Sequence, residues 1–430
     1  MTSRLKVAVI GGGWAGLAAA IEARSRDAVV TLFEMAPQLG GRARAVDASG
    51  LPLDNGQHIL IGAYTQTLAL MKTLGVDLDA AFLRLPLRLV DAAGGGLSLP
   101  PGAALPAFAR AVLRLRAWPF ADRLALLAAA TSWAVRGFRC DPSLTVAALT
   151  ARLPASVRLG LIDPLCVAAL NTPASDASAS VFLRVLKDGL FAGPGSSDLL
   201  LPRSDLTELL PTPAARWLQG AGANLRLAHR VQRVEPQDVG WQVDGENFDR
   251  IILATPPREA ARLTQTFAPA WSRGAAALRY EPIVTLYLQS TGTHLTEPML
   301  ALQSDETKHP AQFVFDRGQL GGPAGLLAFV VSGAQAWVDR GQEATLAATV
   351  RQAHEALGAQ LKGPLQTIKV LVEKRATFRC TPGLVRPLMA IAPGLLAAGD
   401  HVDGPYPATI EGAVRSGLNA ARKALPAARR

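Results

Sequence analysis

Glycines near the start of the chain have the spacing of a phosphate-binding turn. Gly11, Gly13 and Gly16 form GxGxxG directly after the apolar run 5–10 and before an Ala- and Leu-rich stretch. The first glycine of this pattern permits a tight turn, the second lets the backbone approach a pyrophosphate, and the third allows close packing of a helix on a strand. The pattern predicts a dinucleotide at the N-terminus of a helix. The alternative is a glycine-rich turn in another α/β fold.

An acidic residue supports the nucleotide interpretation. Glu34 follows a second apolar run, 29–33, and lies 18 residues beyond Gly16. A carboxylate at this distance can accept hydrogen bonds from the diol of an adenosine ribose. The same carboxylate would repel a 2′-phosphate, so we expect an unphosphorylated ribose.

A polar segment at 54–58 could handle protons. Asp54, Gln57 and His58 lie in it, directly before the apolar run 59–61. The ordinary pKa of histidine lies near neutrality, so His58 is a candidate general acid or base. The alternative is a turn with a structural histidine.

Two further motifs favour FAD over NAD. Gly41 and Arg42 follow the Glu34 strand, and Arg42 could bind a pyrophosphate through charge-assisted hydrogen bonds. Near the other end, a short apolar run leads to Asp400, and the segment 407–414 leads into a helix. Together these motifs resemble the FAD-binding signature of the flavin amine oxidase and phytoene desaturase superfamily.

This resemblance assigns contacts to the C-terminal motifs. It implies that Gly399 and Asp400 meet the ribitol chain and that the helix start near Thr409 and Ile410 meets the flavin pyrimidine edge. Asp400 can accept from ribitol hydroxyls, and the helix N-terminus would stabilise negative charge on the reduced ring; a simple helix N-cap is the alternative for Asp400. The residues expected to contact a non-covalently bound FAD are Gly11, Gly13, Ala15, Gly16, Glu34, Gly41, Arg42, Gln57, Val231, Ala254, Gly399, Asp400, Thr409 and Ile410.

The nucleotide segments lie far apart in the sequence, so one domain must be assembled from discontinuous pieces. We predict an α/β protein with a Rossmann-like FAD-binding domain and an interleaved α+β substrate-binding domain of mixed sheet plus helices. The FAD-binding domain is expected to comprise residues 1–64, 223–262 and 389–430. The substrate-binding domain is expected to comprise residues 65–222 and 263–388.

Two parts of the expected substrate domain carry recognisable patterns. The apolar runs within 278–291 and 312–331 predict strands that floor a substrate cavity. Within 104–138, apolar residues such as Phe108 recur at helical spacing, with arginines such as Arg114 on another side. A basic amphipathic helix pair could lie on anionic lipid. It could equally be two ordinary helices with their apolar faces on the core.

Composition limits the class of protein. The chain has 430 residues, of which 49% are hydrophobic, which excludes wholesale disorder. Its net charge of +10 could attract an anionic membrane surface, or it could reflect arginine usage without any binding role. We expect no nucleic-acid partner. Three widely spaced cysteines favour a reducing compartment over a disulfide framework, and we expect no metal site. Because no signal peptide or apolar span is recognisable, we expect a cytoplasmic protein that could contact the inner face of the cytoplasmic membrane.

Over essentially the whole chain, the sequence resembles the hydroxysqualene dehydroxylases of bacterial hopanoid synthesis, formerly described as squalene-associated FAD-dependent desaturases. The segments that carry this resemblance are 11–17, 54–58 and 407–413. The resemblance implies an FAD-dependent oxidoreductase. A tertiary allylic hydroxyl of the C30 isoprenoid hydroxysqualene would be lost as water, and hydride from N5 of reduced FAD would reach the allylic carbon, giving squalene.

This reaction has further requirements. An external electron donor must reduce the flavin, and the leaving hydroxide needs a proton in a dry, apolar cavity. Asp54, His58 and Glu411 are the candidate proton donors.

Three alternatives remain at this stage. A carotenoid or phytoene desaturase would use the flavin in the oxidising direction. A flavin amine oxidase would use a similar scaffold with an aromatic cage, for which the 4 tyrosines of this chain offer little. A non-catalytic, flavin-binding subunit of a prenyl-condensing complex is the third.

Overall fold

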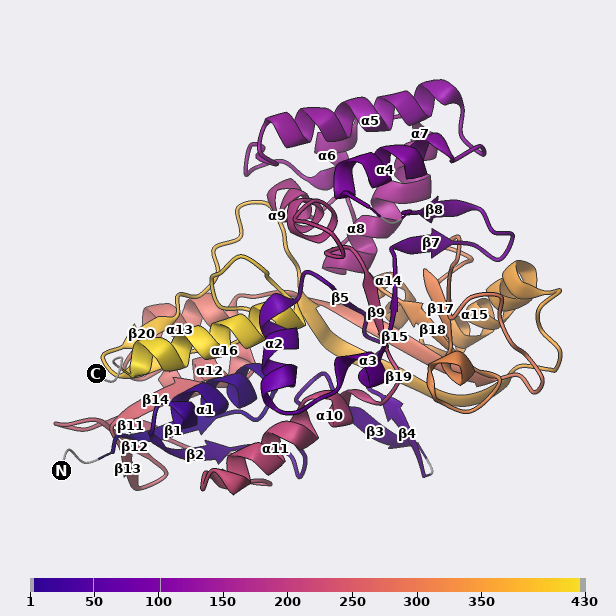
Figure 1. Cartoon of the computed structure of the whole chain (residues 1–430). Helices are drawn as coiled ribbons and strands as arrows, with labels where there is room; N and C mark the ends of the chain where they lie inside the picture. Colours follow the sequence, from indigo (N-terminus) through magenta and orange to yellow (C-terminus); the bar gives the residue numbers. More distant parts are fainter. Residues whose placement is uncertain (1–3, 49, 101, 426–430) are drawn as a thin grey trace.

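The first and last parts of the chain share one sheet (Figure 1). The structure, a computed structural model, describes residues 4–48, 50–100 and 102–425. The strand order is β10-β2-β1-β14-β21-β20, and only the pairing of β20 with β21 is antiparallel. The strands of this nucleotide sheet are β1 (Lys6–Ile10), β2 (Val29–Phe33), β10 (Asn224–Arg226), β14 (Arg250–Leu253), β20 (Ala390–Ala392) and β21 (Leu395–Ala397).

Both faces of the nucleotide sheet are covered. On one face Val7 and Val9 pack with residues of α1, α11 and α16. On the other face Ile10 and Ile251 pack with residues of the β11–β13 sheet and of α12. Burial on both sides explains why β1 and β14 are continuous apolar runs. The covering elements are α1 (Trp14–Ser25), α11 (Pro211–Gly220), β11 (Val234–Pro236), β12 (Trp241–Val243), β13 (Glu246–Phe248), α12 (Pro257–Thr264), α13 (Pro269–Ala276) and α16 (Ile410–Ala424).

A second sheet has the order β16-β17-β18-β15-β19. Side chains alternate along β15: Val284, Leu286 and Leu288 belong to the apolar cluster under α15, whereas Tyr287 belongs to the cluster on the opposite face. The elements here are β15 (Tyr280–Gln289), β16 (Met299–Ala301), β17 (Phe313–Asp316), the 3₁₀ turn Arg317–Leu320, β18 (Leu326–Val331), α14 (Gln335–Arg340), α15 (Gln342–Leu357) and β19 (Gln366–Phe378).

Helices cover the second face of this sheet and form the upper part of the molecule in Figure 1. They are α4 (Ala104–Leu113), α5 (Phe120–Val135), α6 (Val146–Thr150), α7 (Ala155–Val157), α8 (Asp163–Leu170) and α9 (Ala179–Val185), with π-helical turns at Arg158–Ile162 and Leu186–Leu190. The connecting elements are β3 (Ala45–Ala48), β4 (Leu51–Asp54), β5 (Leu60–Ile61), α2 (Thr65–Thr73), α3 (Leu78–Ala81), β6 (Phe82–Leu85), β7 (Arg88–Val90), β8 (Gly96–Ser98), β9 (Leu199–Pro202) and α10 (Leu206–Leu209).

The predicted fold class is confirmed, with one correction. The parallel sheet is assembled from segments far apart in the sequence, as expected. The second sheet was expected to be mixed, and this detail is wrong, because all its pairings are antiparallel. The strands β16, β17 and β18 follow one another through short connections, whereas a parallel pair needs a longer crossover. The boundaries of the two domains stay a prediction.

Within the described residues, no helix combines the length and apolar character that crossing a bilayer requires.

Candidate functional site

The first glycine turn forms an open backbone surface at the start of α1. Gly11 has a φ of +109°, which favours glycine, and a Cβ on Gly16 would lie 1.8 Å from the Gly11 carbonyl oxygen. Gly13 is the N-cap of α1 and has no side chain to cap the helix. The first amides of a helix have no intrahelical acceptor, so they can bind an anion here.

A second glycine turn lies against the first. The amide of Gly40 donates to the carbonyl of Gly12 at 2.9 Å. Among the described atoms, only the Cα of Gly41 lies within 4 Å of the position that a Cβ on Gly13 would take. The two turns together form a cradle of bare backbone, which suits a pyrophosphate because side chains would otherwise keep it away.

Glu34 lies beside this cradle, at the end of β2. Its Oε2 accepts from the amide of Gly12 at 2.7 Å, and its Oε1 accepts from the amide of Ala36 at 2.8 Å. These two bonds fix the carboxylate next to the glycine turn. Each carboxylate oxygen can accept a further hydrogen bond, so the group is still able to bind a diol.

Other predicted contact residues lie around the same turns. Ala254 follows β14, and a Cβ on Gly11 would lie 2.5 Å from its carbonyl oxygen. Val231 lies between β10 and β11, where its carbonyl accepts from Arg262 Nη2 at 2.6 Å. Ala15 is buried in the first turn of α1. Beside Ala254, Thr255 keeps a buried hydroxyl oxygen for which the described residues provide no partner.

Arg42 and Asp400 meet across the two ends of the chain. Arg42 Nη2 lies 2.6 Å from Asp400 Oδ1, and Arg42 Nη1 donates to the carbonyl of Ala376 at 2.6 Å. Burial opposes ionisation of Asp400, but Arg42 and His401 outweigh it and hold the pKa of Asp400 well below its usual range. Asp400 is therefore an anion at neutral pH.

The N-terminus of α16 completes this side of the site. Thr409 caps the helix: its Oγ1 accepts from the amide of Gly412 at 2.9 Å. Ile410 is the first residue of the helix, and Gly399 donates to Ser416 Oγ within it. A Cβ on Gly417 would lie 2.0 Å from the carbonyl oxygen of Ala15, so α16 and α1 touch through backbone. Both helix N-termini can therefore act on one bound molecule.

Asp54 lies at the end of β4 and faces the N-terminus of α10. It is 3% exposed; Oδ1 accepts from the amide of Leu206 at 2.8 Å, and Oδ2 finds no partner among the described residues. Its main-chain carbonyl accepts from the hydroxyl of Tyr287. Burial raises the pKa of Asp54 to about 6. Asp54 can therefore carry a proton in mildly acidic or near-neutral solution.

His58 follows the same segment and is neutral. Its Nδ1 lies 2.6 Å from the carbonyl of Gly56, and a carbonyl only accepts, so the ring proton is on Nδ1. Burial, with a smaller contribution from the charge of Arg42, lowers the pKa of His58 below its ordinary value. The other ring nitrogen, Nε2, is then a hydrogen-bond acceptor, not an acid.

Gln57 lies between these two residues. Its Oε1 is 3.5 Å from Arg317 Nη1, and its Nε2 is buried without a partner among the described residues.

Glu411 has a different environment from the one expected of a proton donor. Its carboxylate accepts from the amides of Gln66 and Thr67 and from the Thr67 hydroxyl, and it pairs with Arg415. It thereby caps the N-terminus of α2, which has no cap of its own. A carboxylate engaged in four bonds is poorly suited to delivering protons.

Sequence reasoning missed three residues around the 54–58 segment. Tyr287 and Thr285 lie on β15, and Arg317 follows β17; all three are buried. The only available signal was that polar side chains interrupt strands that are otherwise apolar. Their position beside Asp54 and Gly56 depends on sheet pairing, which the local pattern does not reveal.

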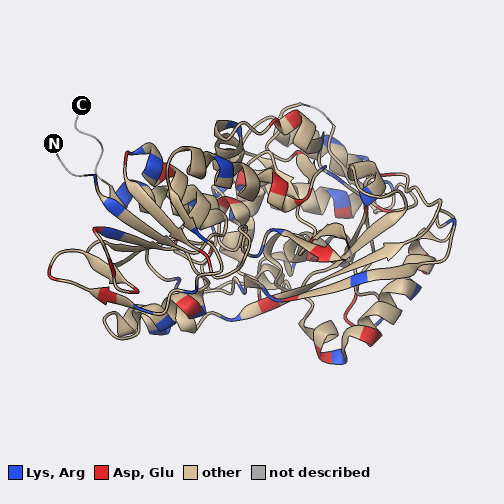
Figure 2. Cartoon of the chain, turned by 90° about the horizontal axis from the view of Figure 1, so that it is seen from below, with Lys and Arg blue, Asp and Glu red and all other residues tan. Residues whose placement is uncertain are grey.

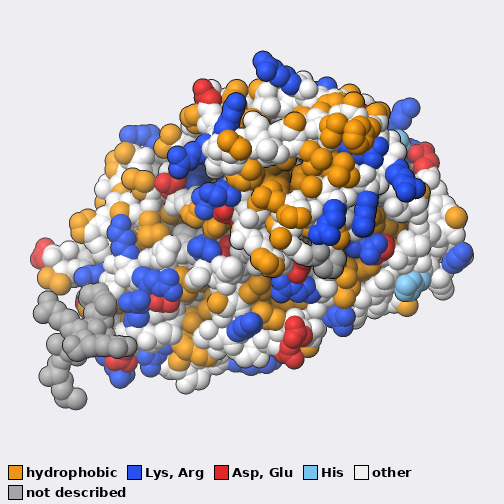
Figure 3. Space-filling model, turned by 45° about the horizontal axis from the view of Figure 1, so that its top comes forward, with side chains coloured by type: hydrophobic (Ala, Val, Ile, Leu, Met, Phe, Trp, Pro, Cys, Tyr) orange, Lys and Arg blue, Asp and Glu red, His pale blue; other side chains and the backbone are white. Residues whose placement is uncertain are grey.

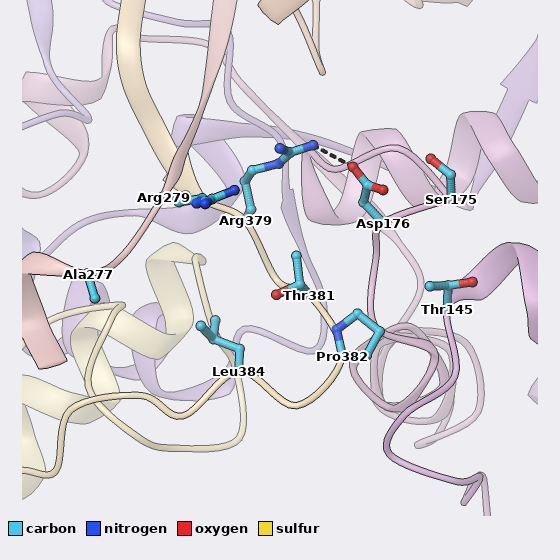
Figure 4. Close-up of a pocket in the computed structure, with 9 residues that line it drawn as sticks. All are labelled: Thr145, Ser175, Asp176, Ala277, Arg279, Arg379, Thr381, Pro382 and Leu384. Carbon is cyan, nitrogen blue, oxygen red and sulfur yellow. Dashed lines mark hydrogen bonds and ion pairs between the residues drawn. The ribbon is translucent and has the colours of Figure 1, made fainter.

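Two pockets differ in character. One lies beneath α4 and α5 and is lined only by apolar side chains, among them Phe108, Leu126, Trp133 and Phe191. The other, of about 500 Å³, lies beyond the end of β19 and has a mixed lining, with charged and hydroxyl side chains beside the apolar Ala277, Pro382 and Leu384 (Figure 4). There Arg379 pairs with Asp176 at 2.6 Å. The first pocket is apolar like a hydrocarbon chain, but its volume is only about 20 Å³, roughly the space that one water molecule needs.

The outer face of α4 and α5 is both apolar and basic. Exposed apolar side chains on it include Phe120, which is 58% exposed, and Leu124, which is 45% exposed. From residue 92 to 140 the sequence has six arginines and a single acid, Asp122. Figure 3 shows hydrophobic side chains gathered on the upper part of the molecule with basic side chains around them. Elsewhere, in the view of Figure 2, basic and acidic residues are interspersed.

The observed groups fit FAD. The structure offers donors and acceptors of the kinds that pyrophosphate, ribose, ribitol and a flavin ring require: a bare glycine cradle, a fixed carboxylate at Glu34, an anion at Asp400 and the N-termini of α1 and α16. The unpartnered polar atoms of Gln57 and Thr255 are further groups that a bound molecule could satisfy.

Comparisons with known proteins identify the family and the fold. A family model described as "Flavin containing amine oxidoreductase" matches residues 14–425. The chain is 27% identical to a hydroxysqualene dehydroxylase of Sinorhizobium fredii, over 97% of this chain and 98% of that one. It is 28% identical to a hydroxysqualene dehydroxylase of Rhodopseudomonas palustris, over 98% and 99%. A solved oxidoreductase from Methanosarcina mazei has the same fold, with a TM-score of 0.72 and 16% identity, over 96% of this chain and 99% of that one.

Proposed function

The chain belongs to the flavin-containing amine oxidoreductases, and we propose that it removes the allylic hydroxyl of hydroxysqualene reductively, giving squalene. It is an FAD-dependent oxidoreductase. The observation that carries the specific reaction is similarity to hydroxysqualene dehydroxylases over nearly the full length of both chains. The reaction consumes two electrons per turnover, so an external donor must reduce the enzyme.

We assign the cofactor contacts as follows. The cradle of Gly11, Gly13, Gly16 and Gly41, with Ala15, would hold the pyrophosphate, and Glu34 would bind the ribose of the adenosine. Val231 and Ala254 would border the adenosine half. The remaining residues would hold the ribitol and ring half: Arg42, Gln57, Gly399, Asp400, Thr409 and Ile410. When bound and reduced, FAD supplies the hydride that replaces the hydroxyl group.

We propose Asp54 as the proton donor. Loss of hydroxide from a carbon chain is slow unless the oxygen receives a proton as the C–O bond breaks. Asp54 has a pKa raised to about 6 and an unpartnered Oδ2, so it can hold a proton and give it up. His58, which is neutral and protonated on Nδ1, suits an accepting role, and Glu411 is occupied as a cap.

The apolar pocket beneath α4 and α5 has a volume of only about 20 Å³, and we propose that its walls move apart to admit part of the isoprenoid chain. Its walls offer no polar side chain that burial of a hydrocarbon would leave unpaired. The apolar cluster that contains this pocket extends to Tyr287 on β15, whose hydroxyl contacts Asp54. A long hydrocarbon could therefore lie with one end in the pocket and its reacting carbon near the 54–58 segment.

We further propose that α4 and α5 contact an anionic membrane surface. A C30 hydrocarbon partitions into lipid, so an enzyme that takes it up gains from lying on the bilayer. The exposed Phe120 and Leu124 would enter the interface, while Arg110, Arg114 and Arg116 would meet anionic headgroups. The apolar pocket lies directly beneath these helices.

One anaerobic experiment tests the proposed reaction. Enzyme with reduced flavin is mixed with hydroxysqualene, squalene or phytoene, while flavin absorbance and products are followed. We expect hydroxysqualene alone to reoxidise the flavin, with one squalene formed per flavin. Oxidised enzyme that is reduced by phytoene, or reduced enzyme that hydroxysqualene does not reoxidise, would contradict the proposal.

A further inference from the structure

Thr285 has a buried hydroxyl group without a partner. The residue lies in the middle of β15 and is 1% exposed, and its Oγ1 has no hydrogen-bond partner among the described residues. Its neighbours across the sheet are Val330 on β18 and Leu371 on β19, which are apolar. Leaving such a hydroxyl unpaired has a cost in stability. Valine would fill the same volume without that cost. The buried hydroxyl therefore points to a bound molecule that forms a hydrogen bond with Thr285.

The side chain of Thr285 points toward the 54–58 segment. Along β15 its alternation places it on the face of Tyr287, whose hydroxyl reaches the Asp54 carbonyl, and not on the face of α15. A Cβ added to Gly56 would lie 3.9 Å from Thr285 Oγ1 and 3.7 Å from His58 Cε1, with no other described atom within 4 Å. Thr285 and His58 therefore approach the same small space above Gly56.

The two side chains at this space have complementary hydrogen-bonding roles. The Thr285 hydroxyl can donate a proton, and neutral His58 can accept one at Nε2. An alcohol has one O–H donor and a pair of acceptor sites, so it can bond to both groups at once. An alkene or a saturated carbon can bond to neither.

We infer that Thr285, with His58, binds the hydroxyl oxygen of the substrate and makes the site selective for the alcohol over the hydrocarbon. This inference rests on the proposed function and extends it, because it names the group that distinguishes substrate from product. Once the hydroxyl has left as water, the hydrocarbon product has lost both bonds. The buried Thr285 hydroxyl then has no partner again among the described residues, which favours release of the product.

Two substitutions test the inference from opposite directions. Thr285→Val removes the hydroxyl and keeps the volume, whereas Thr285→Ser keeps the hydroxyl. Gly56→Ala places a methyl group in the shared space, where its contacts of 3.7 and 3.9 Å are ordinary and the backbone needs no positive φ. Gly274→Ala on α13 is the matched control, since no atom lies within 4 Å of its added Cβ.

The measurement is equilibrium binding to oxidised, flavin-loaded enzyme in detergent micelles. Hydroxysqualene and squalene are titrated separately and followed by flavin absorbance and tryptophan fluorescence. We expect wild type, Thr285→Ser and Gly274→Ala to prefer the alcohol. We expect Thr285→Val and Gly56→Ala to bind the alcohol at least tenfold more weakly, with squalene affinity unchanged for Thr285→Val.

The outcomes separate this inference from the proposed reaction. If wild-type enzyme fails to convert hydroxysqualene, both the proposed function and this inference are wrong. Wild-type enzyme that converts the alcohol, together with variants that keep the full preference for it, overturns the inference alone. If flavin content and melting temperature show that Thr285→Val does not fold, the test rests on Gly56→Ala. Alcohol binding by Gly56→Ala that equals wild type would then overturn the inference.

Discussion

Arg42 and Asp400, 358 residues apart in the sequence, are joined by an ion pair of 2.6 Å. Asp400 is almost entirely buried, and Arg42 is about one-third exposed. The pair links the second glycine turn to the segment before α16. It therefore holds together the parts of the nucleotide site that come from opposite ends of the chain.

Asp400→Asn is expected to weaken FAD retention and to lower the melting temperature. The substitution leaves the Arg42 charge without its partner, at a cost of about 2 kcal/mol once solvent screening of the arginine, which is about one-third exposed, is allowed for. Flavin content per protein and the apparent affinity on reconstitution measure the effect. Asp403→Asn is the control, because Asp403 is 60% exposed and its partner Arg386 keeps a hydrogen bond to the Val402 carbonyl. Equal flavin content in both variants would contradict the role of Asp400.

Asp54→Asn is expected to stabilise the fold above pH 6. The folded pKa of Asp54, about 6, is raised above the ordinary value of 3.8, so the folded state binds this proton more tightly. The free energy of unfolding of wild type therefore falls as pH rises from about 4 to 6, by up to about 3 kcal/mol. Asparagine keeps the acceptor for the Leu206 amide and lacks the charge. Denaturant unfolding at pH 4 and pH 8 should show an advantage of the variant that grows with pH, whereas Asp238→Asn should show none.

The pH dependence of the reaction distinguishes the candidate acids. If Asp54 supplies the proton, the single-turnover rate of wild type falls as pH rises through about 6, and Asp54→Asn is slow at every pH. Glu411→Gln is expected to lower the melting temperature, because the amide replaces a carboxylate that caps α2, while folded enzyme keeps most of its rate. A Glu411→Gln protein that is well folded and inactive would instead return Glu411 to the chemistry.

Membrane contact is tested by sedimentation with vesicles. We expect the protein to bind vesicles containing phosphatidylglycerol and to bind pure phosphatidylcholine weakly, with binding reduced by salt. Phe120→Ser with Leu124→Ser, or Arg110, Arg114 and Arg116 changed together to Gln, should weaken binding at least tenfold. Val385→Ser with Leu388→Ser removes exposed apolar side chains elsewhere and serves as control. Equal binding to both vesicle types by wild type and all variants would contradict the proposal that α4 and α5 contact the membrane.

Local signals were enough to predict the nucleotide half of the molecule. Glycines such as Gly11 and Gly16 are required by backbone geometry within a few residues, so the strand, turn and helix around them could be read directly. The same holds for Glu34, whose distance from the turn is set by one helix and one strand.

Other features depend on contacts between distant segments. Glu411 caps α2, which begins some 345 residues earlier, and no local pattern announces this. The sequence pattern within 104–138 leaves open whether the apolar side chains face lipid or the core. In the structure Phe120 and Leu124 are exposed, because α5 buries Leu126 and Trp133 instead. Thr285 looked like part of an apolar strand, since only the register of the sheet decides which face each residue takes.

The backbone contact between α1 and α16 has a consequence for how the protein folds during translation. Strand β21 and helix α16 are translated long after β1 and α1, so the nascent sheet lacks one of its central neighbours and one covering helix until then. Until then the apolar side chains of β1 and β2 are incompletely buried, and FAD cannot bind to a complete site. Chaperone dependence and flavin supply should therefore matter most around the time that β21 and α16 are translated.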